Sequence, residues 1–285
     1  MTPPDFDALF TRAGVTGWLY AADIDTGHDV GHGPDEPLPT ASMFKVPLLV
    51  ELCRQADAGR LVLTDRVTVP AEGRVPGPTG IAAMLDDVTM SLRDLAYLMI
   101  AVSDNTSADT LLGLIGCDAV NAMLDGFGLT RTRVVQGAGE ANARMREDAG
   151  HAWPYLDPED IARLSVLDPE RTNRSTPREM VRLFELIWRD EAASAESCAW
   201  MRSVLNMQVW PHRLASGFPY DDVAVSGKTG TFPTLRCESG VVEYPDGRRY
   251  AVSVFTRSFS TALNQPRADA VIGTAARMAV DHLRR

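Results

Sequence analysis

The stretch "DDVAVSGKTGTFPTLRCESGVVEYPDGRRYAVSVFTR", residues 221–257, decides the fold. Three runs within it, 221–231, 234–244 and 248–257, have strand character, and the turn sequence "PDG" joins the last two. Runs of β-branched and aromatic residues around short turns are typical of strands that pair with their neighbours. The sequence therefore predicts an antiparallel sheet built largely from the C-terminal part of the chain.

Outward from this stretch, residues 16–23, "TGWLYAAD", and a short run before Pro37 predict an N-terminal hairpin. Helical periodicity dominates the middle, and we expect helices at 43–59, 91–102, 107–115 and 177–191, with another at 266–285. Strands from both ends can share one sheet, which makes the helical middle an insertion. We expect an α+β fold in which residues 1–37 plus 207–285 form an α/β sheet lobe and residues 38–206 form a helical lobe. A site is expected in the cleft between the lobes.

Composition limits the classes of partner. The net charge of −10, without a long basic run, argues against nucleic-acid binding, and no apolar run is long enough to span a membrane. The four cysteines are far apart and match no metal spacing, so we expect free thiols and no metal or cofactor, with a disulfide between two of them as the open alternative. We expect a monomer that binds a small molecule. Without signal-peptide features the protein is expected to be cytoplasmic if Met1 is the native start, and exported if the chain was trimmed.

The chain contains only two lysines among 28 Lys and Arg residues. Lys45 follows Ser42 by three residues at a predicted helix start, so the two side chains share one face. The helix N-terminus favours an alkoxide on the serine and a neutral amine beside it. A lysine can lose its proton in such a place, whereas an arginine stays protonated. Taken alone, however, the S-x-x-K spacing favours the simpler interpretation of a capped helix start.

Two further short sequences carry candidate chemistry. Lys228 in "SGKTGT" ends a predicted strand and can bind a carboxylate, or it can be an edge-strand lysine that discourages aggregation. In "SDN", residues 103–105, the serine hydroxyl can relay a proton and the asparagine amide can both donate and accept hydrogen bonds. The alternative there is a helix break with a capping residue.

Together, S-x-x-K, S-D-N and K-T-G occur in this order on a helix start, an interhelical loop and a strand end. The chain thereby resembles the penicillin-recognising serine hydrolases, and class A β-lactamases most of all, over nearly its whole length. The resemblance implies a serine hydrolase that opens β-lactam rings through an acyl-enzyme on Ser42.

The resemblance also implies roles for individual residues. Ser42 would be the nucleophile, Lys45 its general base, Ser103 the proton relay to the leaving nitrogen, and Lys228 the helper of that relay. The backbone N–H groups of Ser42 and Thr231 would form the oxyanion hole. The implied substrate contacts are Asn105, Thr229, Gly230, Thr231 and, as a weaker candidate, Arg236, with the loop "VPGPTG" (75–80) facing them across the cleft.

One part of the family pattern is absent. Class A enzymes carry E-x-x-L-N, whose glutamate activates the deacylating water, and no Glu or Asp between Asn105 and Lys228 fits that pattern. By position Glu159 or Asp160 could supply the carboxylate, although surface loop charge is the simpler interpretation of both. Three hypotheses follow: a class A-type β-lactamase that deacylates through a loop carboxylate or Lys45, a related D,D-peptidase or esterase/amidase, and a non-hydrolytic sensor that is acylated by β-lactams.

Overall fold

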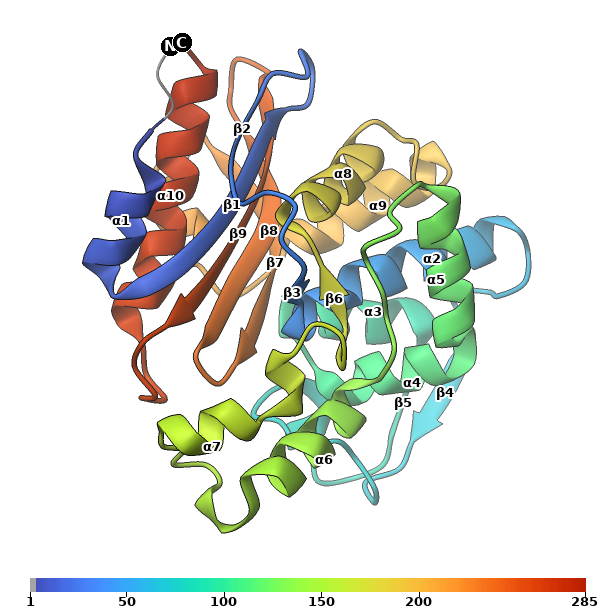
Figure 1. The fold of residues 1–285 in the computed structure, drawn as a ribbon. Helices are drawn as coiled ribbons and strands as arrows, with labels where there is room; N and C mark the ends of the chain where they lie inside the picture. Colours follow the sequence, from blue (N-terminus) through green and yellow to red (C-terminus); the bar gives the residue numbers. More distant parts are fainter. Residues whose placement is uncertain (1–3) are drawn as a thin grey trace.

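The computed structural model describes residues 4–285, so positions 1–3 of the predicted sheet lobe lie outside the described residues. A five-stranded antiparallel sheet with the order β2-β1-β9-β8-β7 forms its centre (Figure 1). The strands are β1 (Val15–Asp23), β2 (Asp29–His32), β7 (Ala224–Phe232), β8 (Leu235–Glu243) and β9 (Arg249–Ser258). Because β1 pairs with β9, the N-terminal hairpin closes onto the last strand of the chain. The predicted α+β fold, with both ends of the chain sharing one antiparallel sheet, is confirmed.

Helices cover both faces of this sheet. On one face lie α1 (Phe6–Ala13) and α10 (Pro266–Leu283), and the helices of the middle segment lie on the other (Figure 1). As a result, β8 is buried from Leu235 to Val242. The polar side chains Arg236, Glu238 and Ser239 are therefore enclosed, and each needs hydrogen-bond partners within the protein.

The middle segment is mainly helical. It contains η1 (Ala41–Phe44), α2 (Lys45–Asp57), η2 (Gly80–Ala83), α3 (Leu92–Ala101), α4 (Asn105–Ile115), α5 (Cys117–Gly126), α6 (Ala138–Ala149), η3 (Gly150–Ala152), α7 (Pro158–Arg163), η4 (Ser165–Leu167), α8 (Pro177–Trp188) and α9 (Ala195–Asn206). The helices expected at 43–59, 91–102, 107–115 and 177–191 correspond to α2, α3, α4 and α8. Two small sheets, β3 (Leu38–Pro39) with β6 (Arg174–Ser175) and β4 (Arg66–Val69) with β5 (Val88–Ser91), were not predicted.

Side-chain caps fix where the helices next to the site begin. The Asp104 carboxylate accepts from the Thr106 N–H at the start of α4, and the Ser91 hydroxyl accepts from the Asp94 N–H at the start of α3. Both caps satisfy N–H groups that have no partner inside the helix. The loop between α3 and α4, which carries the S-D-N sequence, is therefore held at its α4 end by the Asp104 cap.

All four cysteines are free thiols, and Cys53, Cys198 and Cys237 are buried. Among the helices of residues 4–285, none is both long and apolar enough to cross a membrane.

Helix α10 packs backbone to backbone against η5 (Leu214–Gly217). A Cβ on Gly273 of α10 would lie 2.4 Å from the Arg213 carbonyl oxygen, and one on Gly217 would lie 2.2 Å from the Gly273 carbonyl oxygen. Two glycines thus allow the segment before β7 to lie directly on the helix.

We expect Gly273→Ala to destabilise the protein by about 1 to 3 kcal/mol, because the added methyl group meets rigid backbone on the opposite side. Gly113→Ala is the matched control, since Gly113 is also helical and has open space around its Cβ position. The control should be neutral or stabilising by up to about 1 kcal/mol. Urea unfolding of the two variants measures the difference, and equal stability of Gly273→Ala and the wild type would contradict the close packing.

Candidate active site

Ser42 lies in the turn η1, directly before α2. Its neighbour Ala41 has a φ of 44°, in the left-handed region that residues other than glycine rarely adopt. The Thr40 N–H and hydroxyl both donate to the Asn173 carbonyl oxygen, at 2.9 and 3.1 Å, and hold this turn in place. On the other side, a Cβ on Gly230 would lie 2.4 Å from the Thr40 carbonyl oxygen. The glycine of K-T-G therefore makes room for the turn that carries Ser42.

Lys45 has no solvent exposure, and its amine is surrounded by acceptors. Its Nζ donates to the Ser103 carbonyl oxygen at 2.7 Å and to Asn105 Oδ1 at 2.8 Å, and it lies 3.4 Å from Ser103 Oγ. Burial lowers the pKa of Lys45 to about 7, against the opposing charges of Asp104 and Asp109. A neutral amine has two N–H groups, and these can donate to the Ser103 carbonyl oxygen and to Asn105 Oδ1. The lone pair of the nitrogen is then free to act as a base.

Ser103 is the point where both lysines meet. Lys228 Nζ donates to Ser103 Oγ at 3.0 Å and to the Thr229 carbonyl oxygen at 3.0 Å. Burial and the charge of Lys45 lower the pKa of Lys228 well below its ordinary value. The loop holds Ser103 at a φ of 59°, again in the left-handed region. Backbone strain of this kind persists only where the surroundings fix it, and it is common at functional sites.

The loop around Ser103 is fixed by the buried carboxylate of Asp104. Asp104 Oδ2 accepts from the Ile81 N–H at 3.1 Å and from Ser107 Oγ at 2.5 Å, and Oδ1 accepts from the Thr106 N–H at 3.1 Å. In S-D-N the aspartate is thus a structural anchor, whereas Ser103 and Asn105 face the lysines. A cap and a site occupy the same three residues, so both interpretations of S-D-N describe part of the structure.

Two adjoining cavities contain Ser42. The larger, of about 300 Å³, is also lined by Ser103, Asn105, Thr229 and Thr231, and by Pro78 and Thr79 of the predicted facing loop. The smaller, of about 80 Å³, shares Ser42, Asn105 and Thr231 and adds residues of α6. The structure thus brings the residues of all three sequence motifs together. Among residues 4–285, no cluster of three His, Cys, Asp or Glu side chains could hold a metal ion.

The structure does not bring Glu159 or Asp160 to Ser42. Both belong to α7, where Asp160 forms a capping box with Asp157 and an ion pair with Arg163. Neither residue lines a cavity that contains Ser42, and no other Asp or Glu of the described chain does so. The carboxylate of Asp160 serves the start of its own short helix.

Ala138 and Asn142 of α6 face the smaller cavity beside Ser42. Their spacing is that of the first and last residues of E-x-x-L-N, with alanine in place of the glutamate. A match that requires Glu or Asp at the first position of E-x-x-L-N does not find this segment. The asparagine at the last position, Asn142, is the part of the pattern that could have identified it. Nearby, Asp109 accepts from the N–H groups of Ala138 and Gly139 at 2.6 and 2.7 Å. The Asp109 carboxylate therefore holds the start of α6 through these two hydrogen bonds.

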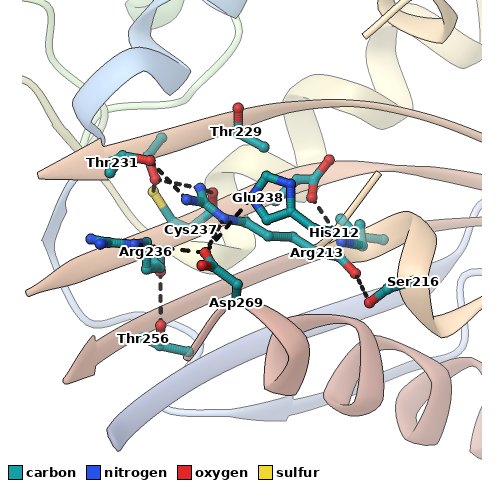
Figure 2. A network of polar contacts seen from close by, with 12 residues as sticks. His212, Arg213, Ser216, Thr229, Thr231, Arg236, Cys237, Glu238, Thr256 and Asp269 are labelled. Carbon is teal, nitrogen blue, oxygen red and sulfur yellow. Dashed lines mark hydrogen bonds and ion pairs between the residues drawn. The ribbon is translucent and has the colours of Figure 1, made fainter. Parts of the chain in front are cut away.

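Arg213, which no sequence pattern marked, lines the larger cavity with Ser42. Its guanidinium donates to the carbonyl oxygens of Gly230 (2.8 Å) and Cys237 (3.1 Å), to Thr231 Oγ1 (2.8 Å) and to Asp269 Oδ1 (2.8 Å) (Figure 2). The predicted Arg236 instead donates to three carbonyl oxygens, those of Phe232, Leu235 and Leu263, and lines neither cavity that contains Ser42. The arginine of the Ser42 site is thus Arg213, which reaches it from the segment before β7.

Comparison with known proteins shows the family of the chain. The sequence profile described as "Beta-lactamase enzyme family" matches residues 4–283. The chain is 34% identical to the β-lactamase regulatory protein BlaB of Streptomyces cacaoi over 300 residues, which cover 98% of this chain and 96% of that protein.

Two solved structures share the fold over nearly their whole length. The β-lactamase of Sphaerobacter thermophilus superposes with a TM-score of 0.79 at 27% identity, over 97% of this chain and 95% of that one. An ancestral class A β-lactamase (GNCA) superposes with a TM-score of 0.81 at 25% identity, over 97% of this chain and 98% of that one. The chain belongs to the β-lactamase enzyme family.

Proposed function

We propose that this protein opens β-lactam rings by acylation of Ser42 and holds the acyl group for long times. One observation carries the proposal: two buried lysines converge on Ser103 beside Ser42, while no carboxylate of the described residues lines the cavities that contain Ser42. The first feature supports acylation. The second supports slow hydrolysis of the ester.

In the proposed acylation, Ser42 Oγ attacks the lactam carbonyl carbon and its proton passes to the neutral Lys45 Nζ. The backbone N–H groups of Ser42 and Thr231 would stabilise the oxyanion. The carbon–nitrogen bond then breaks, and the leaving nitrogen takes the proton of Ser103 Oγ, which lies next to both lysine amines and is reprotonated from them. An ester on Ser42 and a ring-opened amine result, with no net change in protons.

Hydrolysis of that ester requires a base that takes a proton from water. The groups that face the smaller cavity beside Ser42 include the amides of Asn105, Asn142 and Asn173, which can orient a water molecule but are not bases at neutral pH. The name of the Streptomyces cacaoi relative, a β-lactamase regulatory protein, is consistent with a sensor that keeps its acyl group.

A hydrolytic enzyme is the second candidate, and the low pKa of Lys45 favours it, since a neutral Lys45 amine can activate water as well as Ser42. This is the class A-type β-lactamase of the first hypothesis. Failure to react with any β-lactam would instead favour a D,D-peptidase or esterase.

With a chromogenic cephalosporin we expect a burst of one equivalent of opened lactam, followed by a much slower rate. Intact-mass spectrometry should show one acyl adduct per chain, and Ser42→Ala should show neither burst nor adduct, since the nucleophile is gone. Sustained linear turnover by the wild type would contradict the long-lived ester. An unchanged burst in Ser42→Ala would contradict the serine mechanism.

The rate of acylation should rise with pH through about 7. The pKa of Lys45 is lowered, so below about 7 the amine is protonated and cannot take the proton of Ser42. We expect the acylation rate constant to fall about tenfold per pH unit below the pKa and to level off above it. Stopped-flow measurement from pH 5 to 9 tests this, with Lys45→Arg as a variant whose rate should be low throughout. A wild-type rate that does not change with pH would contradict Lys45 as the base.

Ala138→Glu should convert the burst into turnover, because it places a carboxylate at the first position of α6, next to Ser42. We expect deacylation to accelerate by about 100-fold, the lower range for general-base catalysis. Ala138→Gln has the same size without the charge and is the matched control. Equal deacylation rates in the two variants would show that a missing base at this position is not what preserves the ester.

A further inference from the structure

Glu238 is a buried carboxylate on β8 that touches neither Ser42 nor the two lysine amines. It is 1% exposed, and burial raises its pKa against the hydrogen bond from Leu214 and the charges of Arg213 and Lys228. Both oxygens are occupied, Oε1 by Gln208 Nε2 at 2.7 Å and Oε2 by the Leu214 N–H at 2.7 Å. A carboxylate that is this enclosed is stable only with such partners.

Both donors come from residues 207–217, which we call the strap. The strap links α9 to β7, the edge strand of the sheet, and its residue Gln208 bonds the backbone of that strand. Its other end is anchored at the close contact between Gly217 and Gly273 of α10. Residues 209–213 therefore form an arch between two attachment points, Gln208 and Leu214, which share one carboxylate.

Gln208 also binds the edge of β7 next to the catalytic lysine. Its Oε1 accepts from the Thr229 N–H at 2.7 Å, and Thr229 pairs with Glu238 in the register of β7 and β8. Glu238 thus orients the Gln208 amide. The oxygen of that amide in turn accepts the hydrogen bond of the Thr229 N–H, next to Lys228. The edge strand and the strap are joined at this point through two side chains.

The arch carries groups that face the larger cavity. Trp210, His212 and Arg213 line it together with Ser42. Arg213 donates to Thr231 Oγ1 and Lys228 donates to the Thr229 carbonyl oxygen, so both cations lie at this end of β7. Displacing the arch would move Arg213 relative to Lys228 without removing any group that takes part in acylation.

We propose that Glu238, through Gln208 and the Leu214 N–H, is a positioning residue that fixes Arg213 and Lys228 as a paired site for the carboxylate of an acylating ligand. The inference rests on the proposed function, because the ligand is the β-lactam that acylates Ser42. Arg213 and Lys228 supply the positive charge, and Glu238 holds the strap that carries Arg213 against the strand that carries Lys228. Loss of Glu238 should therefore weaken reaction with anionic lactams far more than with neutral ones.

The test uses Glu238→Gln, which keeps the size of the side chain but replaces one of its two accepting oxygens with an NH₂ group. Only one of the two donors, Gln208 or the Leu214 N–H, then keeps an acceptor. We expect the second-order acylation rate constant for benzylpenicillin to fall about tenfold or more, and that for its methyl ester by less than about twofold. The control is Glu243→Gln, at the far end of the same strand, which should match the wild type for both probes. An equal loss for acid and ester, or no loss for the acid, would overturn the proposal.

A second variant and a second measurement guard against failure to fold. Gln208→Leu changes the partly exposed strap rather than the buried carboxylate, and it should give the same difference between acid and ester. Hydrogen exchange of residues 224–232 reports the Thr229 N–H without any ligand, and it should be faster in both variants than in Glu243→Gln. Hydrogen exchange at the same rate as in Glu243→Gln would contradict the anchoring of β7 by Glu238 and Gln208. A wild type that reacts with no β-lactam would refute the proposed function, while the exchange data still decide whether the anchors hold.

Discussion

Two lysine amines without solvent exposure approach the same serine hydroxyl, and the rest of the site is arranged around this crowding. Two ammonium groups so close together in a buried place repel each other and both lose their hydration. Two carbonyl oxygens accept from Lys45, which suits the neutral amine, and Lys228 binds the hydroxyl and one carbonyl oxygen. The contact joins the start of α2, the loop between α3 and α4 and the edge strand β7. It therefore fixes the helical segment against the sheet as well as preparing a base.

Much of this arrangement was predictable because it depends on residue types with few substitutes. A buried amine can lose its proton and a guanidinium cannot, and the two lysines of an arginine-rich chain marked two of the three motifs. The paired strands of the C-terminal region were clear because their β-branched runs are long and their turn is short. The small sheets β3–β6 and β4–β5 were missed because their strands are only two to four residues long, which leaves too few positions for a period to appear.

The remaining features of the site depend on tertiary contacts that leave no local pattern. Arg213 lies in an irregular segment, and only the fold of that segment over β7 brings it to Ser42. Arg236 was a reasonable candidate from its strand position, yet its guanidinium donates to three backbone carbonyl oxygens and lies 3.6 Å from Asp269 Oδ1. Asp160 was placed near the expected loop base by position in the chain, whereas its geometry is that of a helix cap. Arg236 and Asp160 were candidates because of their charge and their position in the chain, whereas Arg213 was not a candidate at all; in all three, the partners that the fold supplies determine the role.

The packing of α6 shows why alanine, and not glutamate, suits position 138. Gly137 and Gly139 let this segment approach Asp109 so closely that a Cβ on either would lie 2.6 or 2.8 Å from a carboxylate oxygen. Asp109 accepts two N–H groups at the start of α6, where the helix dipole favours a negative charge. The start of α6 thus already has its carboxylate, supplied from α4 and turned toward the backbone. A second one at Ala138 would face Ser42 but would lie near Asp109, and mutual repulsion would raise its pKa toward the range in which a carboxylate is an effective base. Under the proposed function, acylation and hydrolysis would therefore be separable, because the groups for the first come from the meeting of two lysines and those for the second depend on one position of one helix.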